Sequence, residues 1–279
     1  RCCFQQETKA HSGKPAMTDI AFKSAKALAS LIRHKKIGCA ELLDHYLRRV
    51  KKYNPLLNAI VATDIPGAQK RARAADEALA KGDVWGPLHG VPMTVKDSHR
   101  AAGMPTTWGV PALKDNIPAS NGLTVQRWVD AGATVFGKTN VPLMLSDLQS
   151  WNEIYGTSNN PWDVTKTPGG SSGGAAAALA AGLTGIEMGS DIASSIRNPA
   201  HFCGIFGHKP TYGVCPPLGH GPFETFSATD ISCVGPLARS AEDLSLGLKV
   251  MAGPDEIEVQ GYRLQLPAPR KKMLADFKI

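Results

Sequence analysis

The chain has 279 residues, of which 43% are hydrophobic and 20% are charged, and this is the composition of an ordinary globular protein. Its formal net charge is +7, but no basic stripe is interleaved with aromatic residues, which argues against direct nucleic-acid binding. No segment reaches the ~20 apolar residues of a transmembrane helix, and the six cysteines form no CxxC pair, so we expect free thiols in a reducing cytoplasm and no membrane partner.

The first part of the chain is predicted to be mainly helical. Apolar residues recur at helical spacing over 24–34 and 39–53, which predicts two amphipathic helices packed against a core. We expect Pro55 to end the second helix, because proline removes a donor from the helix ladder. A strand over 58–63 and a charged helix over 66–81 follow.

Strands then alternate with helices. An apolar run over 91–95 predicts a buried strand with Lys96 at its end. Ser120 or Asn121 is placed to cap the next helix, and a strand over 133–136 follows it. This alternation favours an α/β sheet with helices on both faces.

The most distinctive stretch runs over residues 167–197. It opens with a Gly/Ser-rich loop, 169–174, whose paired glycines let the main chain come close to a ligand. The alanine-rich run 175–181 predicts a helix, and the apolar run 183–188 predicts a buried strand. A second small-residue turn, 191–195, follows. Two hydroxyl-bearing turns around one helix and one strand are typical of a site where serines and main-chain N–H groups converge.

The glycine-rich loop has two alternative interpretations without a reacting serine. A Gly/Ser run is often a flexible linker, but this one leads directly into a strong helix former. A nucleotide-binding loop would hold an anion at the helix N-terminus. It requires Lys and then Ser or Thr after the last glycine, where this chain has Ala175 and Ala176.

A nucleophile elbow is the sharper alternative, because residues 169–173 fit G-x-S-x-G with Ser171 at its centre. That motif requires a buried strand immediately before it and a histidine after it. The preceding segment, 159–168, is polar and contains two prolines, which disfavours a central strand. His208 and His220 are the histidines that such an enzyme would need, and we interpret both as structural.

Four sequence blocks occur in a fixed order: GVPMTVKD, GGSSGG with its alanine-rich helix, GSDIASSIRNPA and FCGIFGHKPT. Together they resemble the amidase signature family of serine hydrolases, over about residues 18–270. The resemblance implies a three-layer α/β/α fold with a mixed central sheet, of which the C-terminal part is missing here. We interpret residues 1–16 as a non-native or upstream extension, and residues 17–279 as the N-terminal portion of the amidase signature domain.

The resemblance implies hydrolysis of an amide to an acid plus an amine or ammonia. Ser195 would be the nucleophile that forms an acyl-enzyme, Ser171 the bridging serine in a cis peptide, and Lys96 the base. A lysine with an ordinary pKa of about 10.4 is protonated at pH 7, so burial would have to lower the pKa of Lys96 by about 3. Lys138 is the competing lysine, and we assign it a loop-anchoring role.

The turn that carries Ser195 would supply the oxyanion site. Main-chain N–H groups of Ile192, Ala193 and Ser194, with that of Ser195 itself, would hold the developing charge. Members of the family usually carry glycine at one or both of positions 193 and 194, so a positive φ at either position would strain this turn.

Two residues are expected to support the same turn: Asp191 would fix it and Arg197 would anchor it. The resemblance implies a small-molecule amide substrate and neither a cofactor nor a metal, and it leaves a homodimer open. Two alternatives are the glutamine-hydrolysing subunit of a tRNA-dependent amidotransferase and a catalytically inactive truncated fragment.

Overall fold

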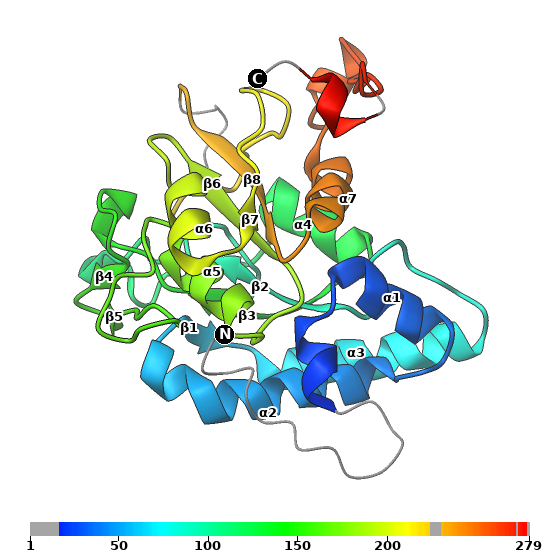
Figure 1. The fold of residues 1–279 in the computed structure, drawn as a ribbon, viewed down its shortest axis with the longest axis horizontal. Coiled ribbons are helices and arrows are strands. Elements are labelled where there is room, and N and C mark those ends of the chain that lie inside the picture. The colour runs from blue at the N-terminus through cyan, green and yellow to red at the C-terminus, as the bar shows by residue number, and fades with distance from the viewer. Residues whose placement is uncertain (1–16, 224–229, 272, 278–279) are drawn as a thin grey trace.

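Two three-stranded sheets and a two-stranded hairpin, with helices around them, form the computed structural model, which describes residues 17–223, 230–271 and 273–277 (Figure 1). The predicted extension over 1–16 lies outside these described residues. The helices are α1 (Ala25–Arg33), α2 (Cys39–Leu57), α3 (Ile65–Ala80), α4 (Leu123–Asp130), α5 (Gly173–Ala180), α6 (Arg197–Cys203) and α7 (Ala241–Met251). The strands are β1 (Ile60–Thr63), β2 (Pro92–Lys96), β3 (Thr134–Thr139), β4 (Trp151–Asn152), β5 (Gly156–Thr157), β6 (Glu187–Asp191), β7 (Phe206–Gly207) and β8 (Cys233–Ala238).

The strands are joined in a mixed pattern. β3 lies between β1 and β2, parallel to β2 and antiparallel to β1. β8 lies between β6 and β7 and is antiparallel to both. The two sheets meet where Gly185 N donates to Pro92 O and Thr94 N donates to Thr184 Oγ1, each at 3.0 Å. The mixed central sheet expected from the sequence is therefore confirmed.

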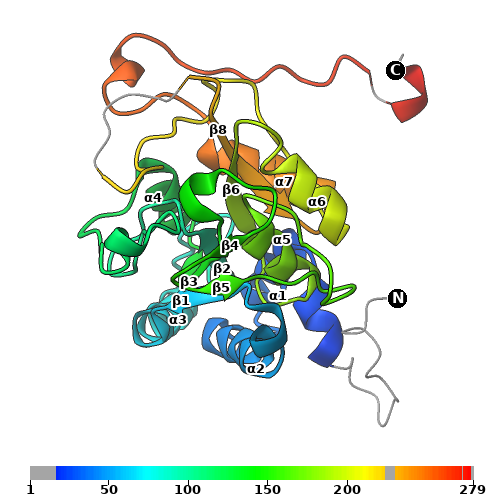
Figure 2. The same ribbon diagram turned by 90° about the vertical axis from the view of Figure 1, so that its left-hand side faces the viewer.

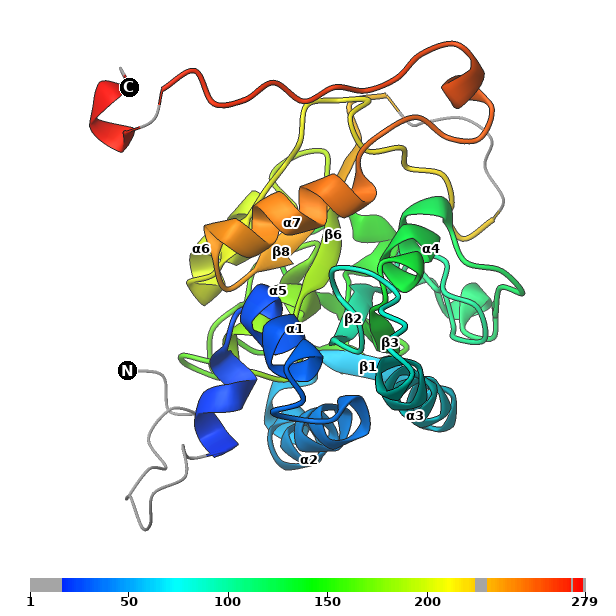
Figure 3. The same cartoon turned by 90° about the vertical axis from the view of Figure 1, so that its right-hand side faces the viewer.

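Helices cover both sides of these strands. In Figure 1, α6 and α5 lie below β6, whereas α4 and α7 lie to the right of β6 and β8. Figure 2 shows the strands between α4 and α5, and Figure 3 shows α7 in front of β8. The arrangement is the expected three-layer α/β/α fold. No helix in the described ranges combines the length and the apolar character needed to cross a membrane.

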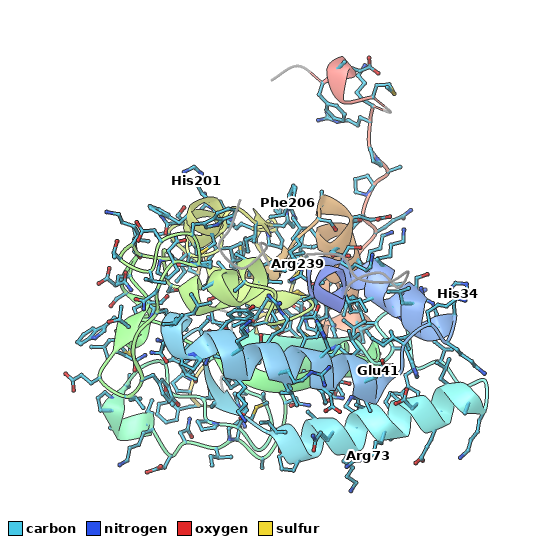
Figure 4. All side chains as sticks on the ribbon, turned by 60° about the horizontal axis from the view of Figure 1, so that its bottom comes forward. His34, Glu41, Arg73, His201, Phe206 and Arg239 are labelled. Carbon is cyan, nitrogen blue, oxygen red and sulfur yellow. The ribbon has the colours of Figure 1, made fainter. Side chains whose placement is uncertain are left out.

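Helices α2 and α3 lie side by side below the β1-β3-β2 sheet in Figure 1. Leu42, Leu43 and Tyr46 of α2 are fully buried, so the apolar stripe of this helix packs into the core as the sequence predicts. On the outer surface, Arg73 points away from α3 into solvent (Figure 4). The two helices are therefore amphipathic in the expected sense.

Helix α5 is buried at every residue. Its first turn lies so close to the end of β3 that a Cβ atom added to Gly174 would lie 2.4 Å from the main-chain nitrogen of Asn140. Only glycine fits at that distance. The glycine pair at the start of the helix therefore allows close packing of protein against protein, rather than the approach to a ligand that the sequence suggested.

The prediction that Pro55 ends α2 is wrong, because the helix continues to Leu57. Near a helix C-terminus, a proline costs few main-chain hydrogen bonds, and the next residues can compensate for them. The side chain of Asn54 accepts from Ala59 N at 3.0 Å and donates to Ile60 O at 2.8 Å. The helix ends instead at Asn58, which adopts a left-handed conformation with φ of 47°.

Two further boundaries differ from the predictions. The strand predicted over 183–188 begins only at Glu187, where its pairing with Leu237 of β8 starts. Helix α4 begins after Gly122 and is not capped by Ser120 or Asn121. The side chain of Asn121 instead accepts from Ala102 N at 2.8 Å and donates to Gln126 Oε1 at 2.8 Å, so it does not cap the main chain of the first turn.

The first and last helices of the fold are tied together by one buried carboxylate. Asp243, in the first turn of α7, is fully buried. Its oxygens accept hydrogen bonds from two main-chain donors at the start of α1, Ala25 N at 2.8 Å and Lys26 N at 3.0 Å. A carboxylate at a helix N-terminus satisfies donors that have no partner within the helix.

We expect Asp243→Ala to lower the free energy of unfolding by about 2–3 kcal/mol, because it leaves one buried and one partly buried N–H group without a partner. Glu242→Ala is the matched control. Glu242 is exposed and pairs only with exposed Lys26, so its loss should cost less than about 1 kcal/mol. Urea unfolding of both variants measures the difference, and equal effects would contradict the capping role of Asp243.

Candidate active site

The predicted lysine and Ser171 meet where β2 and β6 end, together with Ser190. Lys96 is the last residue of β2, and Ser190 is the penultimate residue of β6. Lys96 Nζ lies 3.0 Å from Ser190 Oγ and 2.7 Å from Ser171 Oγ, in the loop before α5. Sequence reasoning did not identify Ser190, although it directly precedes Asp191 in one of the recognised blocks.

Lys96 is completely removed from solvent. Burial disfavours the ammonium form and lowers the pKa of Lys96 to about 7, against the opposing effect of nearby carboxylates, the strongest of which is Asp191. At neutral pH, Lys96 is therefore a neutral amine in a large fraction of the molecules. This is the state in which a lysine is able to accept a proton.

Ser171 and Ser195 come from different loops and line one cavity of about 190 Å³. The peptide bond between Gly170 and Ser171 is cis. The loops are tied together by a main-chain hydrogen bond of 3.1 Å from Ser172 N to Ser195 O. Ser195 is 9% exposed, so its hydroxyl is accessible only through the cavity that it lines.

A buried carboxylate organises the turn between β6 and α6. Asp191 accepts from Ser194 N at 2.9 Å and from Ile196 N at 3.0 Å. Arg197 donates to both carboxylate oxygens, through Nη2 at 2.8 Å and Nε at 3.1 Å. Burial alone would raise the pKa of Asp191, but these hydrogen bonds, first those of Arg197, hold it below its usual value. Asp191 is therefore an ionised anchor for the turn.

The Ser194 N–H is engaged with Asp191, so it serves the turn. Ser194 also has a positive φ of 86°, whereas Ala193 does not. A residue with a side chain is strained in this conformation, and glycine is not. A glycine at this position, which the family resemblance implies at 193 or 194, would relieve the strain, and this chain has a strained backbone next to Ser195.

A second anchored loop forms the opposite side of the cavity. Asp97 Oδ2 accepts from Thr107 N at 3.0 Å and Trp108 N at 2.7 Å. Lys138 Nζ donates to the carbonyl oxygens of Asp97 at 3.0 Å and His99 at 2.6 Å. Lys138 thus has the contacts of a loop anchor. The Asp97 carboxylate thus bonds to this loop. It is not the hydrogen-bond partner of Lys96, the residue before it in the sequence.

Several cavity residues had no recognisable signal in the sequence. They come from loops without a periodic pattern, and they are Trp108, Met144, Leu145 and Ser232. His220, interpreted from the sequence as structural, also lines the cavity. Loop residues of this kind are placed by tertiary packing, which a single sequence does not reveal. Among the described residues, no group of three or more His, Cys, Asp or Glu side chains is placed to hold a metal ion.

The geometry does not favour the alternative motifs. Residues 158–172 form no strand, so Ser171 lacks the preceding strand of a nucleophile elbow. At the start of α5, Gly173 N donates to Ser150 Oγ at 3.0 Å and Gly174 N donates to Asn140 O at 3.3 Å. Main-chain donors that would bind a phosphate there are already satisfied by protein groups.

Comparison with known proteins gives the family. The model of the Amidase family matches residues 41–279. The chain belongs to the amidase family. The amidase signature resemblance of its sequence blocks is thereby confirmed, and the buried lysine and two serines lie in the segments that carry this resemblance.

Individual relatives agree with this assignment. Human fatty-acid amide hydrolase 2 is 41% identical over 249 residues, which cover 86% of this chain and 47% of that protein. The A subunit of glutamyl-tRNA(Gln) amidotransferase from Carboxydothermus hydrogenoformans is 37% identical, over 89% of this chain and 50% of that protein. A bacterial aryl acylamidase of the amidase signature family superposes with a TM-score of 0.81 at 28% identity, over 89% of this chain and 51% of that one. The chain thus spans about half the length of these relatives.

We expect Ser194→Gly to raise the free energy of unfolding by about 1 kcal/mol, because glycine removes the strain of a positive φ. Ala193→Gly is the matched control in the same turn. Its φ is not positive, so the added chain entropy of the unfolded state should make that variant up to about 1 kcal/mol less stable. Denaturant unfolding compares the two, and a shift of the same sign in both would refute the strain at Ser194.

Proposed function

We propose that this amidase family member hydrolyses a small carboxylic amide to an acid plus an amine or ammonia, through an acyl-enzyme on Ser195. The contact of 2.7 Å between buried Lys96 Nζ and Ser171 Oγ, in a cavity that Ser195 also lines, carries the proposal. Serine is a weak nucleophile until a base within hydrogen-bond reach takes its proton. A lysine with its pKa lowered to about 7 is suited to that role.

The proton moves through a relay of three side chains. Neutral Lys96 accepts the proton of Ser171, and Ser171 accepts that of Ser195 as Ser195 Oγ attacks the amide carbon. The relay then runs in reverse, so Ser171 protonates the leaving nitrogen and the C–N bond breaks. A water molecule enters, gives a proton to the relay and hydrolyses the ester on Ser195. Ser190 Oγ, at 3.0 Å, holds Lys96 Nζ in place during both steps.

The developing oxyanion is assigned to main-chain donors of the 191–197 turn. Because the Ser194 N–H is engaged with Asp191, we propose the N–H groups of Ile192, Ala193 and Ser195 as the donors. Removal of one such donor typically costs about 3 kcal/mol of transition-state stabilisation. Asp191 has the supporting role, with Arg197 fixing its carboxylate.

The location of the protein is a separate proposal. Three described cysteines, Cys39, Cys215 and Cys233, are buried thiols outside any disulfide. A reducing compartment such as the cytoplasm keeps thiols in this state. We therefore propose a cytoplasmic enzyme.

We expect Ser195→Ala to abolish amide hydrolysis and covalent labelling by a fluorophosphonate. Ser171→Ala and Lys96→Met should slow labelling by about 100-fold or more, because each removes a step of the general-base relay. Ser172→Ala is the matched control, since its buried hydroxyl donates to Ser190 O and not to the relay. Labelling that persists in Ser195→Ala but is lost in Ser171→Ala would favour the elbow mechanism.

The pH dependence should follow the charge of Lys96. Below its pKa of about 7 the amine is protonated and unable to act as a base. The second-order rate of hydrolysis or labelling should therefore rise about tenfold per pH unit up to about pH 7, and level off above it. A profile over pH 5–9 measures this, and a rate independent of pH across that range would argue against Lys96 as the base.

A further inference from the structure

We propose that the active-site cavity selects uncharged amides with a flat apolar acyl group, and that His220 and Trp108 form the wall that positions this group. The inference rests on the proposed function, because it concerns the substrate of the same cavity. It goes further by naming the substrate class and two positioning residues.

The composition of the cavity lining gives the first argument. Trp108, Met144, Leu145 and Ile192 supply its apolar surface, and the remaining lining residues are serines and His220. None of the described Lys, Arg, Asp or Glu side chains lines it. Burying a charged group without a partner is costly. The cavity is therefore unsuited to the ammonium and carboxylate groups of glutamine, and suited to an uncharged acyl group.

The size of the cavity is consistent with one ring. Its volume is about 190 Å³, and an apolar cavity of about 150 Å³ is enough to bind benzene in another protein. Aromatic rings pack favourably against one another in offset or tilted arrangements. A benzoyl-type acyl group would therefore find both the volume and a matching surface beside Trp108.

The Trp108 and His220 side chains that form this wall are held in place by several contacts. The His220 ring lies 5.2 Å from the Trp108 ring and 4.7 Å from the His99 ring, measured between centroids. His220 Nε2 lies 3.1 Å from Ser98 Oγ, and Trp108 Nε1 donates to Ser98 O at 3.1 Å. Both rings are thus attached to the segment that follows Lys96. Their position is coupled to the position of the base.

His220 contributes an uncharged polar surface to the cavity and does not act as a second base. Burial, with a further contribution from the charge of Lys96, lowers the pKa of His220 to about 3. The imidazole is therefore neutral wherever Lys96 is able to act. A neutral ring accommodates an apolar group without the cost of burying an unpaired charge.

The test uses substrates with the same leaving group. Benzamide and glutamine both release ammonia, so their difference lies in the acyl part. We expect kcat/KM for benzamide to exceed that for glutamine at least ~100-fold, because glutamine must bury two charges without partners. Trp108→Phe, which keeps a ring, should change benzamide kinetics little. Trp108→Ala and His220→Ala should raise the KM for benzamide about tenfold with little change in kcat.

Trp151→Ala is the matched control, because Trp151 is 47% exposed on β4 and does not line the cavity. It should leave both kinetic constants unchanged. Thermal unfolding of each variant identifies any that fail to fold. Hydrolysis of glutamine as efficient as that of benzamide would overturn the inference and leave the proposed amide hydrolysis standing.

Binding provides a readout that does not depend on turnover. Calorimetry with the Ser195→Ala variant should detect binding of benzamide but not of glutamine. When Trp108→Ala or His220→Ala is added to that variant, benzamide binding should weaken about tenfold. If no amide is hydrolysed but this pattern holds, the proposed function fails and the selectivity of the cavity stands. Benzamide binding that is unaffected by either change would overturn the inference.

Discussion

Lys96 and Lys138 are both fully buried, and their partners differ in kind. Lys138 Nζ lies among three main-chain carbonyl oxygens, which only accept hydrogen bonds, and one hydroxyl, that of Thr106. Lys96 Nζ lies between two serine hydroxyls, which accept or donate and therefore suit a neutral amine equally well. Burial lowers the pKa of both lysines, to about 7 for Lys96 and about 8 for Lys138. The two lysines therefore differ in their partners, and Lys96 alone is bonded to Ser171.

Placing Ser171 beside the buried amine, and Ser195 in the same cavity, requires two loops with unusual backbone geometry. Ser171 follows a cis peptide bond. Ser195 follows a residue with positive φ, in a turn held by the Asp191 carboxylate. Because Asp191 is ionised and bonded to Arg197, it offsets part of the strain that Ser194 introduces. The loops are then joined by the hydrogen bond from Ser172 to Ser195.

Most of the fold can be predicted from the sequence, because its local patterns of apolar and helix-forming residues match the helices and strands of the structure. Helical periodicity located α1 and α2, the charged segment beginning near Pro66 located α3, and the apolar run before Lys96 located β2. The positions of Ser171 and Ser195 were expected from family-like blocks, not from any local pattern. Sequence reasoning failed where specific side-chain contacts, local or long-range, decide the outcome. Asn54 and Asn58 stabilise the end of α2 beyond Pro55, and His220 reaches the cavity through contacts with residues 98 and 99.

The seam between the two sheets explains how the amine stays neutral. Along β2 and β6, successive contacts join Pro92 O to Gly185 N, Thr94 Oγ1 to Glu187 Oε1 at 2.7 Å, and Lys96 Nζ to Ser190 Oγ. Burial raises the pKa of Glu187 to about 8, so this carboxyl is mainly protonated at neutral pH. An ionised Glu187 would stabilise the ammonium form of Lys96 and raise its pKa. A seam built from uncharged groups therefore aligns the two strands and limits the negative charge near Lys96, to which Asp191 contributes most, while burial lowers the pKa of Lys96.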